Sequence, residues 1–334
     1  MKIAINGFGR IGRVFFRHAF GERGIEIVAV NDLGSCANLA YLLAHDSVYG
    51  RYEKEVSTED GYLVVDGTRI RFLQEKDPAK LPWSELGIDI AVESTGVFDS
   101  YEKAKTHLDA GAKRVVITAP AKDEGETKTF TPNVGMDFAA AGKITSNASC
   151  TTNAATPVMA VLMQNPGIKK ALLNTVHGYT ASQGLVDGTA TKDFRRGRAA
   201  GVNISPSSTG AAEAVVKAIP GAEGRFDGIA MRVPVISGSL IDFTFVAERQ
   251  TSAEEVNDIF RAAAASKEWK GILRVTEEPL VSTDILRDPH GSIVDLAMTR
   301  VVAGDLVKVL SWYDNEWGYG AMLLKHIESL KNYL

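Results

Sequence analysis

The sequence predicts an α/β protein of two domains, the first built on a parallel sheet and the second on a mostly antiparallel sheet. In the first half, short apolar runs alternate with helical patterns, which indicates a doubly wound parallel sheet. In the second half, residues 240–248, 292–299 and 306–313 alternate between apolar and polar side chains, which is typical of an antiparallel sheet with one covered face. The length of 334 residues is sufficient for two separate cores.

A glycine turn follows the first apolar run, which covers residues 2–5. The turn reads GFGRIG at residues 7–12, a helical pattern continues to residue 20, and a second apolar run ends at Asp32. Asp32 lies 20 residues after Gly12, the spacing expected of a carboxylate that binds a ribose. Glycines let the backbone approach a pyrophosphate at the start of the helix. We therefore predict a dinucleotide site here rather than an ordinary tight turn.

Further strand and helix units continue the first domain. The apolar run at 88–92 leads to Thr95 and Gly96, and the run at 114–117 leads to Thr118. Ligands bind at the carboxyl ends of parallel strands, so these three residues are candidates for lining the cofactor groove. Capping of the strand ends is an equally open interpretation for each of them. Residues 52–72 predict an inserted hairpin around an Asp-Gly turn.

Cys150 stands where a strand-like run gives way to a helical pattern. A cysteine at the start of a helix lies near unpaired backbone N–H groups and the positive end of the helix dipole, and both lower a thiol's pKa. Its neighbours Ser149 and Thr151 are short and polar, which suits the binding of an anion. We predict a nucleophilic cysteine, and the alternative is a small buried one.

His177 ends the apolar run at 171–176 and can form an ion pair with a thiolate and then move a proton. Alone, it would be a structural histidine. Residues 181–204 have little periodicity, which indicates a long functional loop. This loop carries the basic residues Lys192, Arg195, Arg196 and Arg198, which could instead form a solvated face.

A second polar segment precedes the helical pattern at 211–219. It contains Thr209 and Gly210, which suit phosphate at a helix start. Arg232 lies inside the apolar run at 229–235, where a charge needs a partner. That partner is either an oxyanion ligand or a buried carboxylate.

Composition excludes several classes of function. The net charge of −4 does not indicate a general affinity for nucleic acid or for an anionic membrane. Only Cys36 and Cys150 occur, so no disulfide framework is expected and a reducing, cytoplasmic location is predicted. The N-terminus lacks the features of a signal peptide, and no apolar run approaches the roughly 20 residues of a membrane span. We predict no metal site.

Five motifs, in this order and spacing, resemble phosphorylating glyceraldehyde-3-phosphate dehydrogenase over essentially the whole chain. They are NGFGRIGR at 6–13, SNASCTTN at 146–153, STGAA at 208–212, MRVP at 231–234 and WYDNEWGY at 312–319. The resemblance implies a Rossmann domain over 1–148, an α+β catalytic domain over 149–316, and a helix at 317–334 that returns to the first domain. It also implies a homotetramer and a role in glycolysis and gluconeogenesis.

The resemblance further implies the reaction and the site. D-glyceraldehyde 3-phosphate would be oxidised to 1,3-bisphosphoglycerate through a thioester on Cys150, with His177 as the base and inorganic phosphate as co-substrate. The residues that would hold the two phosphates are Ser149, Thr151, Thr180, Ser182, Arg195, Thr209, Gly210 and Arg232. The residues that would bind the cofactor are Gly7, Gly9, Arg10, Ile11, Gly12, Asp32, Lys76, Thr95, Gly96, Thr118, Asn315 and Tyr319.

Two questions remain open at the level of sequence. Asp32 suits the free 2′-hydroxyl of NAD. Thr189, however, stands where the family usually has proline, and members of the family that accept NADP carry small hydroxyl residues in this region. We therefore predict NAD as the main cofactor, with some use of NADP. The nearest alternative activity is erythrose-4-phosphate dehydrogenase, against which Thr180 and the Thr209-Gly210 pair argue. An NAD-sensing regulator or RNA-binding protein would not need an intact Cys150 and His177.

Overall fold

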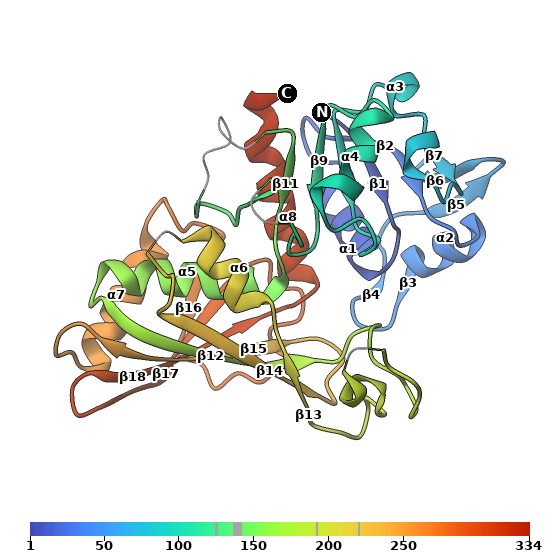
Figure 1. The fold of residues 1–334 in the computed structure, drawn as a ribbon. Helices are drawn as coiled ribbons and strands as arrows, with labels where there is room; N and C mark the ends of the chain where they lie inside the picture. The colour runs from blue at the N-terminus through green and yellow to red at the C-terminus, as the bar shows by residue number, and fades with distance from the viewer. Residues whose placement is uncertain (124–125, 136–141, 192, 220) are drawn as a thin grey trace. The chain divides into compact units, whose positions relative to one another are not determined.

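The computed structural model describes residues 1–123, 126–135, 142–191, 193–219 and 221–334 (Figure 1). The chain forms two compact units. The first consists of Met1–Phe130, Met136–Ala148 and Leu323–Leu334, and the second of Thr131–Gly135 and Ser149–Met322.

The first unit is built on a nine-stranded sheet with the order β10-β11-β9-β8-β1-β2-β7-β6-β5. Its strands are β1 (Lys2–Asn6), β2 (Glu26–Asn31), β5 (Val56–Glu59), β6 (Tyr62–Val65), β7 (Thr68–Leu73), β8 (Ile90–Glu93), β9 (Arg114–Ile117), β10 (Lys128–Thr129) and β11 (Ile144–Ser146). The pairs from β10 to β7 are parallel, which confirms the predicted parallel sheet. The hairpin predicted at 52–72 forms β5, β6 and β7, but β7 also pairs with β2, so it extends the main sheet.

Helices cover both faces of this sheet. They are α1 (Arg10–Ala19), α2 (Cys36–Ala44), α3 (Trp83–Leu86) and α4 (Tyr101–Asp109), with the short η1 (Pro78–Lys80) and the ribbon β3 (His45–Asp46) and β4 (Gly50–Arg51). Ile3 and Ile5 of β1 pack in one buried cluster with Phe15 of α1, whereas Ala4 between them packs with Trp83 of α3. This alternation fits a strand that is buried on both faces.

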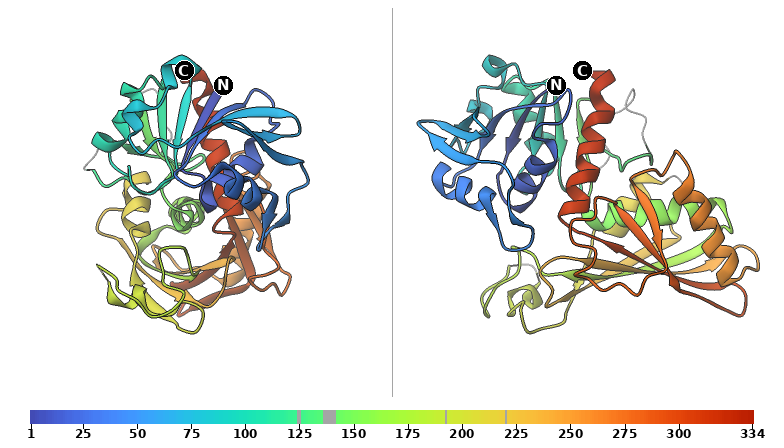
Figure 2. Two further views of the ribbon diagram at one scale, coloured as in Figure 1. Left: turned by 90° about the vertical axis from the view of Figure 1, so that its right-hand side faces the viewer. Right: turned by 180° about the vertical axis from the view of Figure 1, so that it is seen from behind.

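The chain's final helix, α8 (Trp317–Ser329), is followed by η3 (Leu330–Tyr333). From Leu323 onward the chain belongs to the first unit. Figure 2 shows this end of the helix, in red, beside the strands of the first sheet. Leu323, Ile327 and Leu330 are fully buried in the same cluster as α1.

The second unit is built on a seven-stranded sheet with the order β13-β14-β12-β15-β18-β17-β16. Its strands are β12 (Ile168–Gly178), β13 (Ser205–Ser208), β14 (Phe226–Val233), β15 (Ser239–Ala247), β16 (Leu273–Thr276), β17 (Ser292–Val302) and β18 (Leu306–Tyr313). Only the β12–β14 and β16–β17 pairs are parallel, so the predicted, mostly antiparallel sheet is confirmed.

One face of this second sheet is covered by α5 (Cys150–Gln164), α6 (Ala211–Ala218) and α7 (Ala253–Ala265) (Figure 1). Phe243 and Phe245 alternate with half-buried residues along β15 and belong to the core under these helices. The predicted irregular loop at 181–204 contains, among its described residues, only the 3₁₀ turn η2 (Phe194–Gly197) as regular structure. Lys192 of that loop lies outside the described residues. No helix in the described ranges is long and apolar enough to cross a bilayer.

Candidate active site

Cys150 is the first residue of α5, as the sequence pattern suggests. Ser149 caps the helix, because its Oγ accepts a hydrogen bond from the Thr152 backbone N–H at 3.1 Å. Before the cap, Ala148 has a φ of 55°, a left-handed conformation that is uncommon for alanine. The Ala148 N–H donates to Ser146 Oγ at 2.9 Å. The chain therefore turns sharply between β11 and the residue that carries the thiol.

His177 lies near the end of β12 and is 4% exposed. Its Nε2 lies 3.4 Å from the Sγ of Cys150, so the structure brings together the two residues that sequence reasoning paired. The register places Arg232 of β14 directly beside His177. Two neighbouring strands and one helix start thus supply the three side chains at the centre of the site.

The Nδ1 of His177 has two close neighbours with opposite requirements. It lies 2.6 Å from the carbonyl oxygen of Gly178 and 2.6 Å from Nη1 of Arg232. The carbonyl needs a hydrogen on Nδ1, whereas the guanidinium needs a lone pair there, so only one of these bonds forms at a time. When Nδ1–H donates to Gly178, Nε2 is left as the acceptor that can take the thiol proton of Cys150.

Burial dominates the charge balance of this pair. Burial and the positive charge of Arg232 together lower the pKa of His177 to about 3. Burial also raises the pKa of the Cys150 thiol, against the Arg232 charge and hydrogen bonds at the helix start. In this arrangement the thiol and the imidazole are both uncharged. This differs from the ion pair expected from the sequence, which took account of the helix dipole but not of desolvation.

The residues predicted to hold phosphate lie at several points of the second unit. Thr180 Oγ1 lies 2.9 Å from Ser182 Oγ, and Thr209 Oγ1 accepts from the Ala211 N–H at 3.1 Å beside Gly210, the N-cap of α6. The hydroxyl of Thr151 is already engaged, because it lies 2.9 Å from the buried hydroxyl of Tyr313. Ser149 is committed to the cap described above.

The loop arginine that is near Arg232 is not the one singled out from the sequence. Arg195 is exposed and pairs with Asp193, with Nε 3.0 Å from Oδ1. Its neighbour Arg196 instead donates to Ser207 Oγ at 3.0 Å, on the strand that pairs with the strand of Arg232. Burial lowers the pKa of Arg232, and the charge of Arg196 adds to this effect. Sequence reasoning noted both arginines in the loop, but spacing alone could not tell which one turns inward.

Asn315 is held with its amide oxygen inward. That oxygen accepts hydrogen bonds from the Gly238 N–H at 3.1 Å, from Ser239 Oγ at 2.8 Å and from Ser237 Oγ at 3.3 Å. The NH2 group is therefore the end that can donate to a ligand, which suits a carboxamide. Tyr319, also predicted to bind cofactor, is buried in this unit, and burial raises the pKa of its hydroxyl.

In the first unit, a cavity of about 380 Å³ lies along the carboxyl ends of the strands. Its lining residues are Asn6, Gly7, Gly9, Asn31, Asp32, Leu33, Glu75, Lys76, Ser94, Thr95, Val97 and Phe98. Among the described residues, the predicted Arg10, Ile11, Gly12, Gly96 and Thr118 lie outside this lining.

The geometry of this groove fits a dinucleotide. Asp32 is fixed by the N–H groups of Phe8 and Gly34, at 2.7 and 2.8 Å, so its carboxylate stands ready for a ribose hydroxyl. A Cβ at Gly7 would come within 2.7 Å of the Thr95 backbone nitrogen, and one at Gly12 within 2.1 Å of the Gly7 carbonyl oxygen. Only glycine permits this close approach of turn, helix and strand.

Two of the predicted cofactor residues outside the lining have structural partners. Arg10 pairs with Asp46 at 2.5 Å. The Thr118 hydroxyl donates to the Glu93 carbonyl at 3.0 Å, which matches the strand-end interpretation left open above. Within the described ranges, no group of three or more histidine, cysteine or acidic side chains could hold a metal ion.

These two sites define a class of protein: an NAD-binding dehydrogenase with a cysteine nucleophile. Two family models match the chain, the NAD binding domain of glyceraldehyde 3-phosphate dehydrogenase over residues 1–101 and its C-terminal domain over residues 149–315. The chain belongs to the glyceraldehyde 3-phosphate dehydrogenase family.

Curated relatives that are similar to this chain over nearly their whole length are named glyceraldehyde-3-phosphate dehydrogenase. The glyceraldehyde-3-phosphate dehydrogenase of Zymomonas mobilis is 48% identical over 96% of this chain and 95% of its own. That of Borreliella burgdorferi is 48% identical over 99% of both chains. Glyceraldehyde-3-phosphate dehydrogenase 2 of Bacillus subtilis is 44% identical over 98% of this chain and 96% of its own. The similarity therefore extends across both units.

Proposed function

We propose that this chain catalyses the reversible, phosphorylating oxidation of D-glyceraldehyde 3-phosphate to 1,3-bisphosphoglycerate, with NAD as the main cofactor, in glycolysis and gluconeogenesis. The observation that carries this proposal is the 3.4 Å approach of Cys150 Sγ to His177 Nε2, with Arg232 beside His177. A nucleophile, a base and a half-buried cation are the groups that an anionic aldehyde needs for covalent oxidation.

The chemistry follows from the positions of these side chains. Addition of the Cys150 thiol to the aldehyde forms a C–S bond and a hydroxyl group. His177 then accepts the hydroxyl proton while the C–H hydrogen leaves as a hydride, so a thioester remains on Cys150. NAD, when bound, supplies the acceptor for that hydride. Attack of inorganic phosphate on the thioester carbon breaks the C–S bond, releases the acyl phosphate and returns the Cys150 thiolate.

Arg232 would bind the phosphate group of the substrate. An anion at Arg232 would draw its guanidinium away from Nδ1 of His177 and compensate its charge. The Nδ1–H of His177 would then be free to donate to Gly178, and the imidazolium would become easier to form. Arg196, Thr180 and Ser182 are the further candidates for anion contacts, with Thr209 and Gly210 at the start of α6.

Asp32 favours NAD, because its negative charge would repel the 2′-phosphate of NADP. Thr189 lines a separate cavity of about 370 Å³ within the 181–204 loop, together with Ser182 and Arg196. A weaker use of NADP through this hydroxyl is the secondary proposal. The homotetramer and the cytoplasmic location likewise remain proposals that follow from the family resemblance and from the presence of only two cysteines.

A steady-state assay tests this function. The wild-type protein should reduce NAD in the presence of glyceraldehyde 3-phosphate only when inorganic phosphate is present, and kcat/KM should be higher with NAD than with NADP. Cys150→Ser should lose at least about 10⁴-fold of this activity, because removal of the nucleophile of a covalent mechanism leaves only binding and orientation. The variant should still bind NAD, as measured by calorimetry.

Two results would count against the proposal. Turnover that is independent of phosphate would indicate a hydrolytic enzyme, such as one acting on erythrose 4-phosphate. Turnover that survives in Cys150→Ser would remove the thioester from the mechanism.

A further inference from the structure

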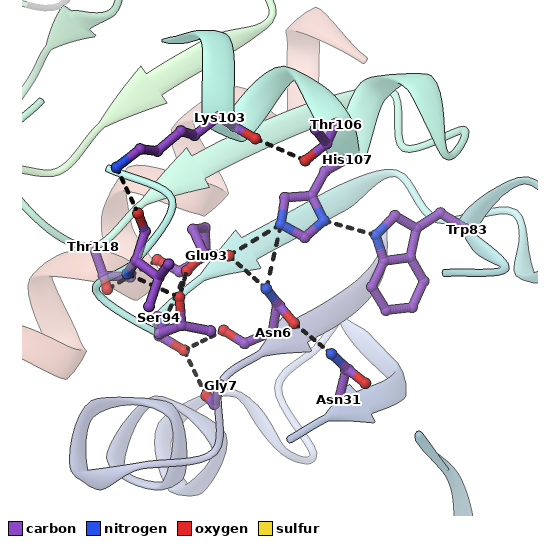
Figure 3. A network of polar contacts seen from close by, with 12 residues as sticks. Asn6, Gly7, Asn31, Trp83, Glu93, Ser94, Lys103, Thr106, His107 and Thr118 are labelled. Atoms are coloured by element: carbon purple, nitrogen blue, oxygen red, sulfur yellow. Dashed lines mark hydrogen bonds and ion pairs between the residues drawn. The ribbon is translucent and has the colours of Figure 1, made fainter. Parts of the chain in front are cut away.

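A buried polar network lies behind the wall of the dinucleotide groove, and the proposed mechanism makes no use of it. At its centre are Glu93, at the end of β8, and His107 of α4, whose side chains are 1% and 0% exposed (Figure 3). The His107 Nε2 lies 3.0 Å from Glu93 Oε2, and the indole Nε1 of Trp83 lies 3.0 Å from His107 Nδ1. Burying so many polar groups is costly unless each one is paired.

The indole determines where the hydrogens lie in this network. An indole nitrogen is only a donor, so Trp83 must donate to His107 Nδ1, which is therefore an acceptor. The single hydrogen of the neutral ring is then on Nε2 and is donated to Glu93. Trp83 thus fixes the tautomer of His107, and His107 fixes one oxygen of the Glu93 carboxylate.

The remaining bonds of Glu93 lead directly to the groove. Asn6 Nδ2 donates to the same Oε2 at 2.6 Å. The other oxygen, Oε1, accepts the backbone N–H of Thr95 at 2.8 Å and also the Thr95 hydroxyl. The carboxylate therefore accepts from four donors. If an NH2 group replaced either carboxylate oxygen, that group would face at least one of these donors without an acceptor between them.

Asn6 and Thr95, the two residues that Glu93 holds, both line the cavity of about 380 Å³. Asn6 in turn accepts from Asn31 Nδ2 at 2.7 Å, and Asn31 Oδ1 accepts from the Glu75 N–H at 2.8 Å. Both of these further residues also line the cavity. One buried carboxylate is thus linked by hydrogen bonds to groove-wall residues from four different segments of the chain.

We propose that Glu93, oriented by His107 and Trp83, is a positioning residue that sets the groove wall for the dinucleotide through Asn6 and Thr95. It contacts no reacting atom, so it controls the affinity for cofactor and leaves the chemical step unchanged. The inference rests on the proposed use of this groove by NAD.

Glu93→Gln is the direct test, because glutamine keeps the shape but puts an NH2 group opposite two donors. We expect the dissociation constant for NAD, measured by calorimetry, to rise at least tenfold, and KM for NAD to rise with it. At saturating NAD, kcat should stay within about threefold of wild type. Glu102→Gln, on the exposed face of α4, is the matched control and should leave both constants unchanged. A folded Glu93→Gln protein with wild-type affinity for NAD would overturn the proposal.

Trp83→Phe tests the same network at the residue that orients His107. It also tests the proposal if the Glu93→Gln protein does not fold. Phenylalanine keeps an aromatic ring but removes the indole donor, which releases His107 to place its hydrogen on Nδ1. We expect a three- to tenfold weaker affinity for NAD and a changed nitrogen-15 shift of His107 in selectively labelled protein. Wild-type protein should show a protonated Nε2 and a bare Nδ1.

A hydrogen on Nδ1 in wild-type protein, or unchanged affinity in folded Trp83→Phe, would overturn the inference. Binding of NAD is measured without substrate in these experiments. They therefore remain informative even if the proposed oxidation of glyceraldehyde 3-phosphate is wrong.

Discussion

Arg232 acts on both Cys150 and His177. Burial raises the pKa of Cys150, and the charge of Arg232 opposes this and favours the thiolate. At His177, burial lowers the pKa, and the charge of Arg232 adds to this effect and disfavours the imidazolium. A thiolate and an imidazolium can therefore coexist only if something else takes up the Arg232 charge. In the proposed mechanism the phosphate group of the substrate would do this, and Arg232 would then both bind the substrate and control the proposed nucleophile.

At this scale we predict the effect of His177→Asn on the thiol. When inorganic phosphate compensates the charge of Arg232, as the phosphate group of the substrate would in the proposed mechanism, an imidazolium at His177 can form 3.4 Å from Cys150 Sγ and stabilise the thiolate, and His177→Asn removes this stabilisation. Thiolate is present above the pKa and lost below it, so in the presence of inorganic phosphate the pH profile of alkylation by iodoacetamide should move to higher pH. A displacement of one pH unit means an alkylation rate about tenfold slower near pH 7.

The alkylation experiment needs a background of Cys36→Ser, because Cys36 is the other free thiol. The parent Cys36→Ser protein is the control. A His177→Asn variant with the parent's profile would show that His177 does not accept the Cys150 proton.

Among the elements, the C-terminal segment contributes a buried histidine to the first unit. His326 of α8 is fully buried, with Nε2 2.9 Å from Thr145 Oγ1 and Nδ1 3.2 Å from Asn147 Nδ2. An amide nitrogen is a donor, so Nδ1 accepts and Nε2 carries the hydrogen. Burial lowers the pKa of His326 to about 4, so the helix is docked with a neutral ring.

This makes the docking of α8 sensitive to acid. An unfolded histidine binds a proton near pH 6.5, whereas His326 does so only near pH 4, so between these values the unfolded chain binds more protons. Stability therefore falls as the pH falls through this window, by about 2 kcal/mol between pH 6.5 and pH 5. The urea midpoint of unfolding should depend less on pH in His326→Gln than in wild type.

His45→Gln, at an exposed position of the same unit, is the matched control for this experiment. The comparison concerns the slope of the midpoint with pH, so a general loss of stability in His326→Gln does not affect it. Equal slopes for wild type and His326→Gln would contradict the prediction. His177, whose pKa burial lowers to about 3, adds a dependence of the same sign in both proteins.

At the scale of the whole molecule, two sets of exposed apolar side chains are unusual for a monomer. The first is on the outer face of the second sheet, where Leu172 is 65% and Ile229 is 50% exposed. Leu172 also lines a cavity of about 570 Å³ there. The second is in the 181–204 loop and consists of Leu185, Val186, Phe194, Val202 and Ile204, each more than 70% exposed. Such surfaces usually mark protein interfaces.

These surfaces are consistent with the homotetramer that the family resemblance implies, and we expect a mass of four chains in light scattering at micromolar concentration. Leu172→Glu should produce smaller species, because each copy would place a buried charge in an apolar interface at a cost of several kcal/mol. Val281→Glu changes another exposed apolar residue outside both sets and should leave the mass unchanged. A wild-type monomer would rule out the homotetramer.

Some interactions lay beyond sequence reasoning because they depend on contacts between distant segments. Glu93 and His107 follow ordinary strand and helix patterns, and nothing in the spacing shows that His107 lies between Glu93 and Trp83. Arg195 and Arg196 are adjacent in the chain, yet only folding decides which one pairs with Asp193 and which one lies near Arg232. The hairpin at 52–72 was recognised from its turn, but its pairing with β2 was not.

By itself, the sequence determined the class of fold, the glycine turn with Asp32, and the place of Cys150 at a helix start, because these depend on local periodicity and spacing. The tertiary structure decided the charges. Desolvation favours the neutral forms of both Cys150 and His177, where local patterns predicted an ion pair, and the charge of Arg232 opposes this effect at the thiol but adds to it at the imidazole. The electrostatic cost of burial depends on everything packed around a group, and no local stretch of sequence contains that information.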